Sequence, residues 1–154
     1  MNAGALLLLA GAGLLFARRA DAGGFDDTWT GGTVTYSSSI RRMAEAIAYA
    51  EGFYAAGTPI PKRLNNPGDL KRSSVPNVGT DAAGHLEFAT IADGWEALHR
   101  QLQLIVDGRS RVYTLDMTIA QMAAKYAEGS TQWAANVSRR LGVGDSTTLR
   151  AVLL

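Results

Sequence analysis

The sequence predicts an α+β fold that is mainly helical and contains a small β-hairpin region. A stripe of apolar residues at three- and four-residue spacing covers residues 40–51, which is typical of one buried helix face. Residues 58–89 contain all four prolines and many turn formers, and further amphipathic helices follow them. With 154 residues, the chain is long enough for one such domain and an appendage.

Residues 1–20 form an apolar segment that is predicted to be helical. Residues 1–17 carry no charged side chain and would reach about 26 Å as a helix, slightly less than a hydrocarbon core of about 30 Å. Arg18 and Arg19 end the apolar run, and their long stems can reach lipid headgroups. An uncleaved membrane anchor is the leading interpretation. A signal peptide cut after residues 20–22 and a helix buried in a partner assembly are the alternatives.

The arginines follow the apolar segment, so the positive-inside tendency places the main domain on the cytoplasmic side of a membrane. This orientation suits a phage lysin that waits inside its host, or a protein of a virion membrane. The predicted location is therefore membrane-associated, in a virion membrane or the host cell envelope.

Residues 21–37 are rich in Gly, Asp, Thr and Ser, which predicts a flexible linker with a short strand at 33–36. The main domain then covers residues 38–154. Ser38 or Ser39 is expected to cap its first helix, and Glu51 continues the buried stripe to the helix end.

The turn-rich segment predicts a hairpin or a three-stranded ribbon. Residues 65–68, Asn-Asn-Pro-Gly, are a strong turn signal because Asn and Gly accept unusual backbone angles. Residues 85–88 alternate in polarity, so Leu86 and Phe88 are expected to face inward and Glu87 outward.

Four helical segments are predicted after the hairpin, the last of them a short turn. Gly108 and Gly142 are expected to end two of them, and Trp95 and Trp133 are expected in the core. The expected N-caps are, in order, Thr90 or Asp93, Thr118, Ser130 or Thr131, and Ser146.

Charge and composition exclude several classes of protein. The formal net charge is +1, without the basic excess of a nucleic-acid binder. The absence of cysteine excludes disulfide scaffolds and thiol nucleophiles. His85 and His99, the two histidines, are not spaced as metal ligands on one helix turn and are expected at the surface. No metal or cofactor is expected.

From about residue 40 to residue 154, the chain resembles the lysozyme-like domains of phage and prophage peptidoglycan-degrading proteins, including virion-associated lytic transglycosylases. The Asn-Asn-Pro-Gly element is the most specific part of the resemblance, whereas Tyr-Ala-Glu at 126–128 departs from the Trp-Ala-Pro common among such relatives. The matching segments are residues 50–54, 64–70, 86–88, 93–98, 118–122 and 137–143.

Glu51 is the predicted catalytic acid. Cleavage of a glycosidic bond needs a proton on the leaving oxygen, and a carboxylic acid supplies one at neutral pH only if its pKa is raised. Apolar neighbours such as Ile47 and Phe53 would raise it by desolvation. The resemblance implies the same role, because the family's acid lies at this helix end.

A hydrolase needs a second carboxylate, and the candidates are Asp69, Asp81 and Glu87, with Asp69 named first. A turn-capping role is the more ordinary interpretation of Asp69. A lytic transglycosylase needs no second carboxylate, because the N-acetyl group of the substrate stabilises the cationic centre. The lack of an obvious second acid favours that route slightly.

Asn65, Asn66, Tyr54 and Tyr126 are the predicted substrate-binding residues. The two asparagine amides can bind sugar hydroxyls or the N-acetyl group, or they can simply hold an irregular turn. Tyr126 can reach the cleft, or it can pack in the core on the stripe with Ile119.

The predicted function is cleavage of peptidoglycan between N-acetylmuramic acid and N-acetylglucosamine by a lytic transglycosylase or muramidase that a phage or prophage encodes for cell-wall penetration or lysis. The expected partners are glycan strands, a membrane bound through residues 1–20, and other virion proteins, but not nucleic acid. The alternative is a non-catalytic, membrane-anchored virion or envelope protein that keeps the fold to bind the cell wall.

Overall fold

The computed structural model describes residues 34–127 and 130–154, and this part of the chain is mainly helical with one two-stranded sheet. The predicted α+β class is therefore confirmed. The apolar segment 1–20 and most of the linker lie outside the described residues. Within the two described ranges, no helix has the length and apolar character needed to cross a membrane.

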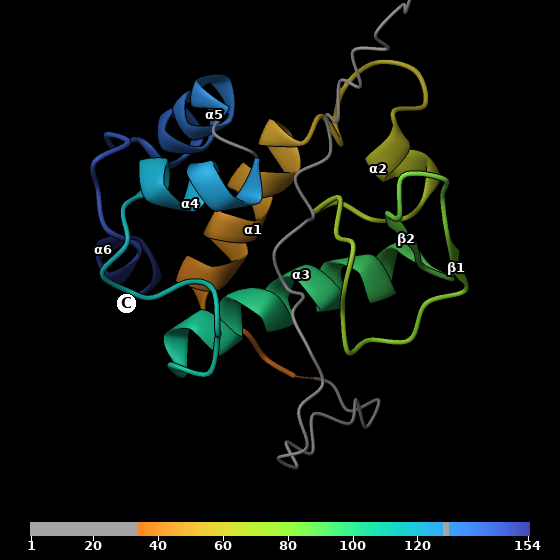
Figure 1. Ribbon diagram of the computed structural model, residues 1–154, viewed down its shortest axis with the longest axis horizontal. Helices are drawn as coiled ribbons and strands as arrows, with labels where there is room; N and C mark the ends of the chain where they lie inside the picture. The colour runs from red at the N-terminus through yellow and green to blue at the C-terminus, as the bar shows by residue number, and fades with distance from the viewer. Residues whose placement is uncertain (1–33, 128–129) are drawn as a thin grey trace, which may run out of the picture.

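Helix α1 lies at the centre of the molecule, and the other elements gather around it (Figure 1). Helices α4, α5 and α6 lie on one side, the hairpin and α2 lie on the other, and α3 runs across both parts. The helices are α1 (Ser38–Ala50), α2 (Ile60–Arg63), α3 (Ile91–Val106), α4 (Ile119–Tyr126), α5 (Thr131–Leu141) and α6 (Leu149–Leu153).

The N-cap of the first helix lies one residue before the expected positions. Ser37, not Ser38 or Ser39, is the N-cap, and its hydroxyl accepts a hydrogen bond from the Ile40 amide at 3.2 Å. The predicted apolar stripe is confirmed, since it forms the buried face of α1 against α3, α5 and α6. Its buried members include Ile40, Met43, Ala44, Ile47 and Ala48.

The end of the predicted linker belongs to the folded domain. Tyr36 is buried in the core, and its hydroxyl donates a hydrogen bond to Glu96 Oε1 at 2.6 Å. Residues 34–37 form no strand, so the strand expected at 33–36 is wrong for the part that is described. Burial of one large aromatic side chain outweighs the flexible composition around it.

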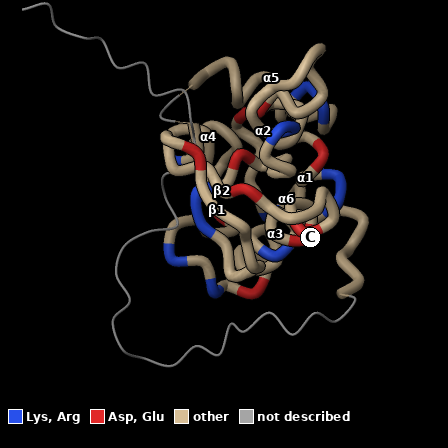
Figure 2. Tube along the Cα trace, turned by 90° about the vertical axis from the view of Figure 1, so that its right-hand side faces the viewer, with Lys and Arg blue, Asp and Glu red and all other residues tan. Residues whose placement is uncertain are grey.

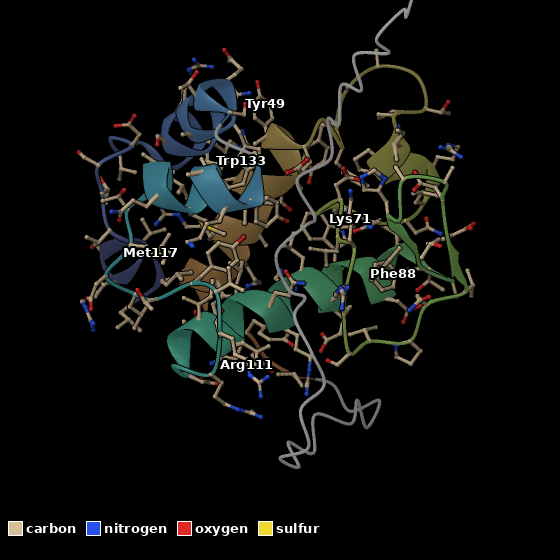
Figure 3. The ribbon with its side chains drawn as sticks, in the orientation of Figure 1. Tyr49, Lys71, Phe88, Arg111, Met117 and Trp133 are labelled. Carbon is tan, nitrogen blue, oxygen red and sulfur yellow. The ribbon has the colours of Figure 1, made fainter. Side chains whose placement is uncertain are left out.

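The hairpin has two antiparallel strands, β1 (Gly79–Thr80) and β2 (Leu86–Glu87), with Gly79 opposite Glu87 and Thr80 opposite Leu86. Leu86 and Phe88 are buried and Glu87 is exposed, as the alternation predicts. Phe88 is labelled in Figure 3 at the end of α3 that lies next to the hairpin.

Most of the predicted helix boundaries are confirmed. Thr90 and Thr118 form capping boxes with Asp93 and Gln121, and Ser130 caps α5. Gly142 ends α5 in the left-handed conformation at φ 75°. The last helix is capped by Thr148 and not by Ser146.

Candidate functional site

Glu51 lies where α1 ends, and its carboxylate contacts the start of α5. Its backbone amide still donates to the Ile47 carbonyl at 2.9 Å, while Gly52, at φ 78°, turns the chain away. The indole Nε1 of Trp133 donates a hydrogen bond to Glu51 Oε1 at 2.7 Å. The two helices run in opposite directions, since Arg42 of α1 donates to the Leu141 carbonyl at the far end of α5. Trp133 is labelled on α5 in Figure 3.

Burial makes the Glu51 carboxyl a weak acid. Its pKa is raised to about 8, first by desolvation and then by the negative charge of Asp69, against the opposing hydrogen bond from Trp133. The carboxyl therefore carries its proton at neutral pH. Because Oε1 already accepts the indole hydrogen, the acid proton belongs on Oε2. The residue keeps partial exposure, so a ligand can approach it.

Asp69 lies close enough to Glu51 for its negative charge to raise the pKa of the Glu51 carboxyl. It is only 6% exposed and adopts a left-handed backbone conformation with φ 48°. Burial raises its pKa, the charges of His85 and Lys71 lower it, and Asp81 raises it. Its Oδ1 is buried without a hydrogen-bond partner among the described residues. Lys71 is labelled in Figure 3, between the helical part and the hairpin.

The other two candidate carboxylates differ in their surroundings. Glu87 is exposed on β2. Asp81 Oδ1 accepts hydrogen bonds from the amides of Ala83 and His85, both at 2.9 Å, which places this carboxylate in the hairpin turn. Asp69 is therefore the candidate whose charge acts on Glu51.

Asn66 does not face a cleft, and its predicted contact with substrate is corrected to a structural role. The side chain is 0% exposed, and its amide bonds only to backbone groups. Oδ1 accepts from the Leu70 amide at 2.8 Å, while Nδ2 donates to the carbonyls of Leu70 and Leu86 at 2.8 and 2.9 Å. The amide thus ties the turn before Asp69 to the hairpin and offers a sugar no free group.

Asn65 is partly exposed, so its substrate-binding role stays a prediction. Its Nδ2 donates to the Phe88 carbonyl at 3.0 Å, and its backbone is left-handed at φ 52°. A left-handed conformation is tolerated by asparagine better than by most residues. The structural and the ligand-binding interpretations are compatible for this residue.

Tyr126 belongs to the core behind the site. It is 2% exposed, its hydroxyl donates to the Gly68 carbonyl at 2.6 Å, and its ring stacks on Trp133 with centroids 5.0 Å apart. Its predicted substrate contact is therefore corrected to packing. Tyr54 is 49% exposed and donates to Glu45 Oε2 at 2.6 Å, so its binding role stays a prediction.

Two features of the site were missed from the sequence. Trp133 was expected to be simply core, but its indole also binds Glu51. His85 was expected at the surface, yet it is 1% exposed and lies between Asp69 and Asp81. The one local signal is the spacing of four residues between Asp81 and His85 across a turn that contains Gly84.

A row of aromatic rings begins beside Glu51 and crosses onto α3. Phe53 packs edge-on against Trp95 at 5.9 Å, Trp95 stacks on His99 at 5.8 Å, and His99 lies 5.0 Å from Tyr36. Trp95 is half-buried and packs against the core cluster, so its expected place in the core is confirmed in part. His99 is likewise half-buried, and burial lowers its pKa.

A hollow of about 390 Å³ lies at the other end of the α1–α5 pair and does not include Glu51. The hollow is lined by Ser38, Arg41, Arg42, Glu45, Arg140 and Leu141, so three arginines meet there. Elsewhere along the chain trace, acidic and basic residues are mixed (Figure 2).

Comparisons with protein-family models, with curated proteins and with solved structures find no match. The chemistry of the site is therefore argued from its own side chains. Among the residues that the structure describes, no group of three or more His, Asp or Glu side chains is placed to hold a metal ion.

Proposed function

We propose that the protein cleaves the glycosidic bond between N-acetylmuramic acid and N-acetylglucosamine in peptidoglycan, with Glu51 as the proton donor. The observation that carries this proposal is the state of the Glu51 carboxyl. With a pKa of about 8, it is both protonated at neutral pH and able to release the proton to a leaving group. The resemblance to lysozyme-like domains supplies the substrate class.

The proposed reaction begins with transfer of the Glu51 proton from Oε2 to the glycosidic oxygen. The carbon–oxygen bond to the anomeric carbon then breaks, and its electrons stay with the leaving sugar. Glu51 is left as a carboxylate, which still accepts the Trp133 indole hydrogen bond at Oε1. That bond stabilises the charge that forms during the step.

Asp69 supports hydrolysis as the outcome. Its charge acts on Glu51, so a second carboxylate is available to stabilise the cationic centre or to activate water. This removes the reason for preferring a transglycosylase, namely the lack of a second acid. In the hydrolytic route, the oxygen of water bonds to the anomeric carbon and gives a reducing end, while the proton that water releases passes to a carboxylate and Glu51 ends the cycle protonated again.

The test is digestion of purified peptidoglycan by the full-length protein, with fragments identified by mass spectrometry. We expect soluble muropeptides with reducing ends, and their loss in Glu51→Gln, because an amide has no acid proton. Glu87→Gln is the matched control, since Glu87 is an exposed glutamate on β2. Fragments with 1,6-anhydro ends would instead identify transglycosylation.

Undiminished fragment release by folded Glu51→Gln would overturn the proposal. Sedimentation of the wild-type protein with insoluble wall material, without any released fragments, would also overturn it. That second result would favour the non-catalytic wall-binding protein.

A further inference from the structure

His85 is a buried titratable side chain that the proposed reaction does not use. It comes from the end of the hairpin turn, and its two ring nitrogens face two different carboxylates. Nδ1 lies 2.9 Å from Asp81 Oδ2, and Nε2 lies 3.3 Å from Asp69 Oδ2. The side chains of His85 and Asp69 are 2% and 9% exposed, so water screens this contact little.

Asp81, His85 and Asp69 form a series of three side chains, and Asp81 holds the histidine in place. The His85 backbone amide also donates to Asp81 Oδ1 at 2.9 Å, so both the ring and the backbone are tied to the same carboxylate. A carboxylate facing Nδ1 in this way accepts the Nδ1 hydrogen, which assigns the tautomer of the ring. Nε2 is then the nitrogen that lies opposite Asp69 and can share a proton with it.

The contact between His85 and Asp69 leaves buried polar atoms without hydrogen bonds from the described part of the chain. Neither His85 Nε2 nor Asp69 Oδ1 has a hydrogen bond among the described residues, although both atoms are buried. An unprotonated Nε2 opposite an ionised carboxylate would be two acceptors facing each other. One proton between them removes the conflict, either as imidazolium with carboxylate or as neutral imidazole with carboxylic acid.

We propose that His85, anchored by Asp81, is a positioning residue that shares one proton with Asp69 and thereby sets the charge that Asp69 presents to Glu51. The assignment of Asp69 as the second carboxylate of the reaction rests on the proposed function, but the shared proton does not. His85 touches no substrate in this scheme and acts only through Asp69.

The charged groups around Asp69 fix the direction of the effect. Lys71 and His85 favour its ionised form, Asp81 opposes it, and burial opposes it most strongly. Glu51 and the Tyr126 hydroxyl face it from α1 and α4, and the Asp69 charge raises the pKa of each. Loss of the His85 charge therefore leaves Asp69 protonated over a wider pH range.

Two limits of the pH–activity profile report these two carboxyls. The acidic limit reflects ionisation of Asp69, and the alkaline limit reflects loss of the Glu51 proton. In His85→Gln the acidic limit is expected to rise by at least one pH unit. The alkaline limit is expected to stay in place, because Asp69 is ionised at that limit in both proteins and still raises the pKa of Glu51. The profile of kcat/KM thus narrows from the acidic side.

The decisive measurement is a carbon-13 NMR titration of the Asp69 carboxyl in the full-length protein, with Asp69→Asn used to identify its signal. A nitrogen-15 titration of the same wild-type protein follows His85 Nε2, and we expect its signal and the carbon-13 signal of Asp69 to change over the same pH interval. In His85→Gln the Asp69 midpoint should rise by at least one pH unit. His85→Asn keeps a donor towards Asp81 and removes any group at the Nε2 position, so it should give the same shift.

An Asp69 midpoint that is unchanged in a folded His85 variant would overturn the proposal, as would independent titration of the two signals in the wild-type protein. The wild-type measurement decides the question if both variants fail to fold. If the protein releases no muropeptides and the Asp69 midpoint still shifts, the proposed function fails and this inference stands.

Discussion

Gly94, in the first turn of α3, lies directly against the backbone carbonyl of Asn65. A Cβ atom at residue 94 would be 1.8 Å from the Asn65 oxygen and 2.9 Å from Pro67 Cδ. The close contact seats the Asn-Asn-Pro-Gly turn on α3, and this turn leads directly to Asp69. The glycine is therefore required by packing and not by its own backbone angle.

Gly94→Ala is expected to destabilise the protein by about 3 kcal/mol or more, because the backbone of the turn must move away from α3. Urea denaturation followed by circular dichroism measures the change. Gly79→Ala is the matched control, since a Cβ there meets no atom within 4 Å, and it should cost less than about 1 kcal/mol. Equal stability of the two variants would contradict the packing argument.

Asn66→Asp is expected to cost about 3 kcal/mol at neutral pH. The new carboxylate oxygen would face the carbonyls of Leu70 and Leu86 in place of the two amide donors. The penalty should shrink as pH falls towards about 4, because the buried acid binds its proton more tightly than the unfolded chain does, and a protonated acid can again donate to one carbonyl. Urea midpoints of this variant across pH test both statements. Asn77→Asp, at an exposed position, should leave the midpoint nearly unchanged.

Glu51 should make the protein less stable as pH rises. Its folded pKa of about 8 lies above the ordinary value of 4.5, so the folded state binds the proton more tightly than the unfolded state. Stability from this group is complete below about pH 4.5 and is lost progressively as pH rises to about 8. The free energy of unfolding of Glu51→Gln, relative to that of the wild-type protein, should rise by on the order of 3 kcal/mol between pH 5 and pH 9. Parallel stability curves would contradict the raised pKa.

Trp133→Phe removes the hydrogen bond to Glu51 Oε1 and keeps an aromatic ring against Tyr126. Because that bond favours the ionised carboxylate, the Glu51 pKa should rise by about one further unit. A carbon-13 titration of the Glu51 carboxyl measures the shift. Trp95→Phe is the control, since the ring contacts of Trp95 are to Phe53 and His99. A shift of the same size in both variants would show that the indole bond is not its cause.

Local patterns predicted the helical elements well. The apolar stripe of α1 and the capping residues Thr90, Thr118 and Ser130 depend on neighbours within one or two turns, which a sequence displays directly. The position of Glu51 at the end of the buried stripe follows from the same periodicity. The raised pKa of its carboxyl was predicted from apolar neighbours for the same reason.

The site's polar contacts could not be predicted in this way. Trp133 is 82 positions away from Glu51. Asp69 and His85 meet because the Asn66 amide and the backbone hydrogen bond from Leu86 to Leu70 tie the turn to the hairpin. Polar residues in turns are ordinarily exposed, so nothing local marked Asn66 and His85 as buried.

Helix periodicity and capping depend on residues close together in the chain, so the amino-acid pattern is enough to predict an α+β domain whose central helix ends in a partly buried glutamate. The groups that surround this glutamate come from distant parts of the chain and become known only from the folded structure. Hydrogen bonds and charge interactions act over a few ångströms in space, and packing of α3, α5 and the hairpin around α1 brings those groups together.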